Sequence, residues 1–168
     1  MTRILIPIGG TRNDTFALQH VVKRFLNNGA MEVHLVNVQT PFSSYVAQFS
    51  SRRNRLDHHR EQAEKALAPA TAMLDKFSIP YAVHMEIGDK AALITETARR
   101  LGCDEIVMAT ARKNSLTRLV EASVTDRVLA LTPVPVEVIA GDSMSKWERY
   151  GIPSAIAAAA AMALAIED

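Results

Sequence analysis

Residues 104–123 read DEIVMATARKNSLTRLVEAS, and this stretch decides the fold class. It opens with the apolar run 106–108, which is typical of a buried strand. Small and polar residues follow, and the stretch closes on Ser123, with Asp126 three residues later. A serine with a carboxylate three residues on predicts a helix N-terminus, because both side chains satisfy free amides of the first turn. We therefore predict a strand, a polar loop and a helix start, the layout at which anions bind in open α/β sheets.

The rest of the chain alternates apolar runs with amphipathic segments. Expected strands lie at residues 3–8, 32–38, 80–87, 105–110 and 136–140. Expected helices lie at about 14–28, 56–77 and 89–101, and from 123 onward. Such alternation implies right-handed crossovers and a parallel sheet with helices on both faces. The sequence thus predicts one α/β domain over residues 1–141, and periodicity alone leaves the strand order open.

Several residues predict where the helices begin, end or bend. Asn13 or Asp14 is expected to cap the first helix and Asp89 the third. Gly29 and Gly102 follow helices, where a left-handed residue ends the helix. Pro69 falls inside the second helix and is expected to kink it. The polar loop 39–55 precedes that helix, and its arginines suit a solvated face.

Composition excludes several classes of protein. With 168 residues, of which 48% are hydrophobic, the chain is large enough for a real core. A net charge of +1 gives no general attraction to nucleic acid or membranes. The single Cys103 excludes an internal disulfide and suits a small buried residue better than a nucleophile. No signal peptide is evident at the start, so we expect a cytoplasmic protein.

Residues 142–168 are expected to form a C-terminal extension. Its apolar, alanine-rich part spans 152–166 and predicts a helix of about 22 Å, too short for a hydrocarbon core of about 30 Å. A membrane span is therefore not expected. An apolar helix without a polar stripe needs a partner surface, on its own domain or on a second subunit.

Five short pieces of the chain occur in the order and with the gaps of a known family. They are Ile-Leu-Ile-Pro-Ile-Gly-Gly-Thr at 4–11, Gly-Asp at 88–89, Asp-Glu-Ile-Val-Met at 104–108, Ser-Val-Thr-Asp-Arg-Val-Leu at 123–129 and Pro-Val-Pro-Val at 133–136. Over residues 2–141 the chain resembles the universal stress protein family. The resemblance implies a Rossmann-like open sheet of order 3-2-1-4-5, a role in stress response and a homodimer.

The resemblance also locates a nucleotide site and shows where this chain departs from it. In nucleotide-binding members, three spaced glycines and a hydroxyl follow the fourth strand. These positions fall on Ala109, Arg112, Ala122 and Ser123, so only the hydroxyl is kept. The family's aspartate after the first strand falls on Gly9. If ATP or another nucleotide binds, the candidate residues are Gly10, Thr11, Thr110, Arg112, Asn114, Ser115 and Ser123.

Two functions remain after this reading. The first is a non-enzymatic stress protein module with a degenerate nucleotide site, which acts through protein contacts as a homodimer joined by the fifth strand and the C-terminal tail. The alternative is a nucleotide-binding switch or slow ATPase with an altered phosphate loop. No residue is identified as catalytic. His34 and His84 are expected on neighbouring strands, but a metal site would need further ligands and none is evident.

Overall fold

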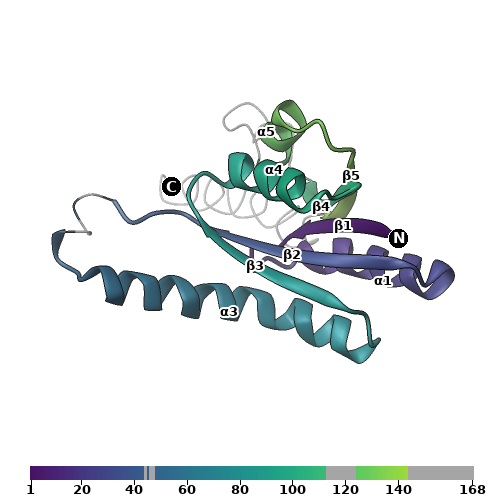
Figure 1. The fold of residues 1–168 in the computed structure, drawn as a ribbon, viewed down its shortest axis with the longest axis horizontal. Coiled ribbons are helices and arrows are strands. Elements are labelled where there is room, and N and C mark those ends of the chain that lie inside the picture. The colour runs from purple at the N-terminus through teal and green to yellow at the C-terminus, as the bar shows by residue number, and fades with distance from the viewer. Residues whose placement is uncertain (44, 46–47, 113–123, 144–168) are drawn as a thin grey trace, which may run out of the picture.

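The computed structural model describes residues 1–43, 45, 48–112 and 124–143. At its centre lies a five-stranded sheet of order β3-β2-β1-β4-β5, in which every pairing is parallel (Figure 1). The strands are β1 (Thr2–Pro7), β2 (Met31–Gln39), β3 (Tyr81–Ile87), β4 (Glu105–Arg112) and β5 (Val136–Ser143). The parallel sheet predicted from the alternation of elements is confirmed, and so is the order implied by the resemblance.

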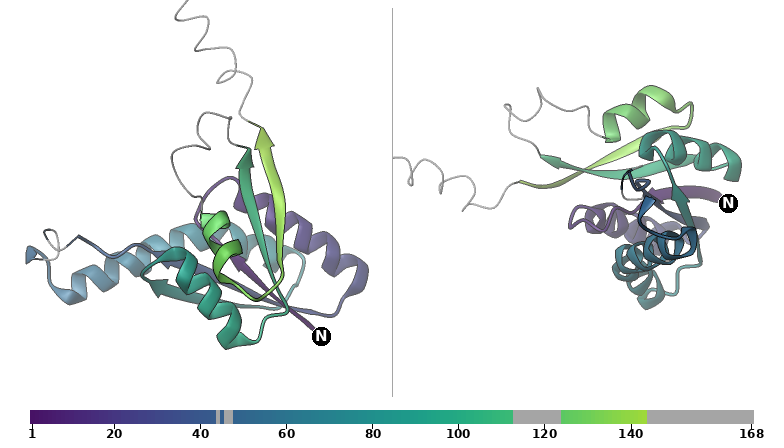
Figure 2. Two further views of the ribbon diagram at one scale, coloured as in Figure 1. Left: turned by 90° about the horizontal axis from the view of Figure 1, so that it is seen from above. Right: turned by 90° about the vertical axis from the view of Figure 1, so that its left-hand side faces the viewer.

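Helices cover both faces of the sheet, as predicted. They are α1 (Asp14–Asn28), α3 (Arg52–Lys76), α4 (Lys90–Leu101) and α5 (Val124–Leu131). Figure 2 shows α1 and α3 on one side of the sheet and α4 and α5 on the other. Two separate apolar cores result, one beneath each pair of helices.

The central strand β1 shows why the sheet is buried on both faces. Ile4 and Ile6 belong to the core beneath α1 and α3, whereas Leu5 belongs to the core beneath α4 and α5. All three side chains are fully buried. Because side chains alternate along a strand, only a near-continuous apolar run can serve two cores at once. That is the pattern from which this strand was predicted.

Helix ends follow the predicted signals closely. Gly29 and Gly102 end α1 and α4 with φ of 65° and 62°, the left-handed region that favours glycine. Asp89 caps α4, since its carboxylate accepts the amide of Ala92 at 2.9 Å.

Other boundaries differ from the prediction. Helix α3 begins at Arg52, earlier than the predicted residue 56, because Ser51 Oγ accepts the amide of Asn54 at 3.1 Å and caps the helix there. It continues through Pro69 to Lys76, so the proline does not end it. Both β4 and β5 run beyond the predicted residues 110 and 140, with a shift of register after Thr110.

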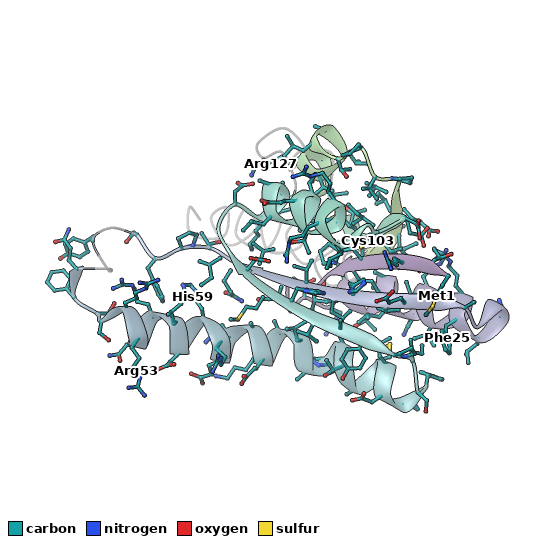
Figure 3. All side chains as sticks on the ribbon, viewed as in Figure 1. Met1, Phe25, Arg53, His59, Cys103 and Arg127 are labelled. Carbon is teal, nitrogen blue, oxygen red and sulfur yellow. The ribbon has the colours of Figure 1, made fainter. Side chains whose placement is uncertain are left out.

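Cys103 lies just after α4 and is buried, as the sequence suggested (Figure 3). Burial raises the pKa of its thiol to about 11, so the thiol stays protonated at neutral pH. In the part of the chain that the structure describes, no helix is both long and apolar enough to cross a bilayer. The predicted C-terminal helix lies outside the described residues, and the division into a domain and an extension stays a prediction.

Candidate functional site

A cavity of about 270 Å³ opens at the carboxyl ends of β1, β2 and β4. The chain leaves β1 toward β2 on one side and leaves β4 toward β5 on the other, so the cavity lies at the point where the strand order reverses. Ligands of open α/β sheets bind at such a point. The lining residues with polar side chains are Thr11, Asp14, Asn37, Gln39, Lys90 and Thr125.

The turn between β1 and α1 forms one wall and is organised by Asp14. Its carboxylate accepts the amides of Gly9 and Thr11 at 3.0 and 2.8 Å. It also accepts the hydroxyl of Thr11 at 2.9 Å. Asp14 is the first residue of α1, where the helix dipole favours a negative charge. The side chain thus occupies three of the donors that this turn could offer to an anionic ligand.

The predicted cap of α1 needs a correction. Asn13 precedes the helix, but its side chain accepts no capping hydrogen bond. Asp14 lies inside the first turn and points its carboxylate back to the preceding turn instead of capping its own helix. A carboxylate at this position can satisfy free amides either by capping its own helix or by accepting from the preceding turn, and residue type alone does not distinguish the two.

The end of β2 forms the floor of the cavity. Asn37 is buried, and its Nδ2 donates to the carbonyl of Ile8 at 2.7 Å. Its Oδ1 accepts from Gln39 Nε2 at 2.6 Å. Asn37 therefore ties β2 to the end of β1 and orients Gln39 beside the cavity. Sequence reasoning missed this pair, although an asparagine between Val36 and Val38 interrupts an apolar strand and is itself a signal.

The structure separates the sequence-predicted site residues. Thr11 lines the cavity. Gly10 lies on the α3 side of the turn, where a Cβ would stand 3.0 Å from the Cβ of Ala66. Thr110 pairs with Ala140 of β5, beyond the residues that line the cavity. Arg112 ends β4. Asn114, Ser115 and Ser123 lie outside the described residues.

Two histidines meet elsewhere, on β2 and β3. His34 Nδ1 and His84 Nε2 are 3.2 Å apart, so one ring donates a hydrogen bond to the other. Burial lowers the pKa of His84, and the neighbouring His34 and Arg100 lower it further. Within the described ranges, no group of three or more histidine, cysteine or carboxylate side chains is arranged to hold a metal ion. The pair is best described as a hydrogen-bonded contact between strands.

The size and lining of the cavity limit what it accepts. Ligand sites commonly enclose about 300–1,000 Å³. At about 270 Å³ the cavity between the described residues lies near the lower end of this range, enough for a ring-sized group. Val36, Val38 and Met108 supply apolar contact, and Lys90 supplies a positive charge at its edge. The arrangement can bind and orient a small group, and the described residues that line it include no evident nucleophile with a paired base.

Comparison with known proteins supports this reading of the fold. A family model described as the universal stress protein family matches residues 1–140. Among curated proteins, no sequence matches the chain.

Solved structures of low sequence identity share the fold. The chain matches the hypothetical protein MJ0577 with a TM-score of 0.68 at 24% identity, over 84% of this chain and 97% of that one. It matches the universal stress protein UspA from Lactobacillus plantarum with a TM-score of 0.65 at 20% identity, over 82% and 97%. A universal stress protein family member from Arabidopsis thaliana, described with AMP bound, matches with a TM-score of 0.61 at 12% identity, over 84% and 93%.

Proposed function

Because the chain belongs to the universal stress protein family, whose model matches residues 1–140, we propose that it is a non-enzymatic stress-response module. It acts through protein contacts as a cytoplasmic homodimer, and its nucleotide site is degenerate. The arrangement of Asp14 is the observation that carries this proposal.

A phosphate group needs free donors, and Asp14 already accepts hydrogen bonds from three of the donors in the β1–α1 turn. The amides of Gly9 and Thr11 and the hydroxyl of Thr11 all donate to its carboxylate. A phosphate placed there would displace or face a negative charge, which is unfavourable. Ala109 lines the cavity at a position where the family resemblance places a glycine in nucleotide-binding members. Both departures support the proposal that the nucleotide site is degenerate.

Thermal unfolding in the presence of millimolar ATP and magnesium tests the degenerate site. A ligand that binds the native state raises the melting temperature by mass action, so we expect no shift for the unaltered protein. The Asp14→Asn variant removes the negative charge that faces a phosphate at the turn, and any shift that it gains would identify that charge as the obstacle. A saturable shift in the unaltered protein contradicts the proposal.

The homodimer is supported by the edge of the sheet at β5. In the described part of the chain β5 pairs only with β4, and an open edge of this kind needs cover. Val138 on β5 and Leu129 and Leu131 on α5 are exposed apolar side chains at this end of the molecule. A second copy and the apolar tail would cover them across a two-fold axis.

Light scattering on the full chain and on a chain shortened by residues 143–168 tests the assembly. We expect a dimeric mass for the full chain, and either a lower mass or reduced solubility after truncation. An unchanged mass together with unchanged solubility in the shortened protein would rule out a role for the tail.

A second candidate function, a nucleotide-binding switch or slow ATPase, is favoured by the position of the cavity at the reversal of strand order. Lys90 at its edge would then hold the phosphate of a bound nucleotide. This candidate predicts that a nucleotide is released when the purified protein is denatured, as mass spectrometry would detect. It also predicts that Lys90→Ala abolishes any melting shift caused by AMP or ATP.

A further inference from the structure

The edge of the sheet opposite β5 is formed by β3, and its backbone groups are oriented outward in a regular way. In the described residues β3 pairs only with β2. Gly88, just after β3, donates its amide to the carbonyl of Gln39 on β2 at 2.9 Å. Because backbone groups alternate in direction along a strand, the amides and carbonyls of Val83, Met85 and Ile87 point away from β2. These three residues present an open template for another strand.

The side chains of the same three residues are apolar and exposed. Val83, Met85 and Ile87 are 46%, 38% and 36% accessible to solvent. They share the face of β3 with Tyr81, which packs against the core beneath α3. Leu56 on α3 is 47% exposed and lies beside them. One strand edge therefore offers both backbone donors and a row of unpartnered apolar side chains.

A groove follows this edge between β3 and the first turns of α3. A hollow of about 500 Å³ is lined by Met85, Leu56, Arg52, Arg53, Asp57 and Arg60. A second hollow of about 190 Å³ adjoins it and is lined by Ile87 together with Leu56 and Arg52. We call the surface formed by Val83, Met85, Ile87, Arg52, Leu56 and Arg60 the edge groove. The edge groove is apolar along its floor and cationic along its helix side.

Charge along the edge groove is one-sided. Asp57 is the one acidic side chain among the described residues that line the larger hollow, and it pairs with Arg53 at 3.9 Å. Arg52 and Arg60 make no ion pair with any other residue that the structure describes. The first turn of α3 holds no acidic side chain, and its dipole adds positive potential. Figure 3 shows Arg53 directed away from the sheet, on the outer side of α3.

We propose that the edge groove binds an extended acidic segment of a partner protein, which adds a sixth strand beside β3. Strand addition uses main-chain hydrogen bonds for affinity and alternate side chains for specificity. The outward backbone groups of Val83, Met85 and Ile87 supply the main-chain hydrogen bonds, and the apolar side chains of the same residues supply the specificity. The arginines then select acidic residues at the ends of the segment. This inference rests on the proposed protein-contact function and names the partner's chemistry.

A protein segment fits this surface better than a phosphate-bearing polymer does. A nucleic acid or anionic lipid would use the arginines but leave the row of backbone donors and apolar side chains without partners. A strand of five residues, matching 83–87, spans about 16 Å at ~3.3 Å per residue. The partner segment therefore needs apolar residues at alternate positions over roughly that length, with carboxylates flanking them.

Fluorescence anisotropy with a defined peptide tests the proposal on the full chain. The probe is a labelled Glu-Glu-Val-Thr-Ile-Thr-Val-Glu-Glu peptide, and its partner probe carries lysine in place of each glutamate. We expect saturable binding of the acidic peptide and at least about tenfold weaker binding of the lysine peptide. Absence of saturable binding, or equal binding of both peptides, would overturn the proposal.

Two variants separate charge from strand addition. Arg60→Glu reverses an exposed charge in the groove, and Lys23→Glu makes the same change on an exposed turn of α1. We expect about fivefold weaker binding or more for Arg60→Glu and less than about twofold for Lys23→Glu. Met85→Pro removes an amide that points outward, which an edge strand tolerates, and it should abolish binding. Equal losses in the two charge variants, or unchanged binding by a folded Met85→Pro protein, would refute the inference.

Competing partners are separate arms of the same experiment. Tighter binding to phosphatidylserine vesicles or to an oligothymidylate than to the acidic peptide would overturn the assignment to a protein segment. Circular dichroism establishes whether each variant is folded. If the Met85→Pro variant does not fold, the Arg60→Glu variant still decides the test. The ATP titration and the light-scattering mass do not involve β3. A failed peptide experiment beside a flat ATP titration would therefore reject the groove and leave the proposed function standing.

Discussion

Replacing Asp14 with alanine should destabilise the protein through the turn that this carboxylate holds. Three hydrogen bonds are lost, from the amides of Gly9 and Thr11 and from the hydroxyl of Thr11. Hydrogen bonds to a charged group contribute about 1.5–3 kcal/mol each where water is excluded, and capping residues about 0.5–2 kcal/mol in all. Because water reaches this turn, the smaller scale applies. We expect Asp14→Ala to lower the free energy of unfolding by about 1–2 kcal/mol.

Urea unfolding followed by circular dichroism measures this loss. For a chain of this length, 1 kcal/mol corresponds to about 2–4 °C in melting temperature, so a fall of roughly 2–8 °C should accompany it. Asp57→Ala is the matched control, because the Asp57 side chain is exposed on α3 and its ion-pair partner, Arg53, is 3.9 Å away. If both variants unfold at the same urea concentration, the carboxylate of Asp14 does not hold the turn, and the proposed occupation of its donors by Asp14 is refuted.

Two further predictions concern packing and pH. Gly141→Ala places a Cβ 2.8 Å from the backbone carbonyl oxygen of Thr110 and 2.6 Å from the Oδ1 of Asn13. Because the backbone cannot easily move aside, we expect this overpacking to cost about 1–3 kcal/mol in unfolding free energy. Gly9→Ala meets only an ordinary contact at 3.6 Å and should cost little. Equal urea midpoints for the two alanine variants would contradict this. Burial lowers the pKa of His84 below 6.5 in the folded protein, so the unfolded chain protonates this imidazole more readily than the folded chain does. The stability that neutral His84 contributes is therefore present above pH 6.5, and it is lost as pH falls through the lowered pKa. His84→Gln should therefore flatten the decline of the urea midpoint between about pH 7.5 and 5, and an unchanged decline would assign it to other groups.

Most of the sheet could be predicted from the sequence, because its signals are local. The run Ile4 to Ile6 is apolar at every position, which only a strand between two cores requires. Gly29 and Gly102 mark helix ends through a backbone conformation that other residues avoid. The start of α3 was missed because its first residues, from Arg52, show no apolar periodicity. The Ser51 cap was present in the sequence but lay inside a stretch interpreted as loop.

The site was harder to predict, because its geometry depends on contacts between distant parts of the chain. Gly10 and Thr11 are neighbours in sequence, yet the turn directs Thr11 toward the cavity and Gly10 toward Ala66 on α3. Asn37 on β2 reaches Ile8 at the end of the neighbouring strand β1, a contact that only the register of β1 with β2 determines. The family pattern pointed to the correct edge of the sheet, whereas the tertiary fold decides which side chains line it.

The reactivity of the buried Cys103 thiol measures local opening of the structure around it. The chain contains one cysteine, so a thiol reagent modifies a single position without any engineering. With a pKa of about 11 and little exposure, the sulfur reacts only in those molecules whose segment after α4 has opened. The modification rate, compared with that of the unfolded chain, therefore gives the fraction of time for which this corner of the α4 core admits solvent.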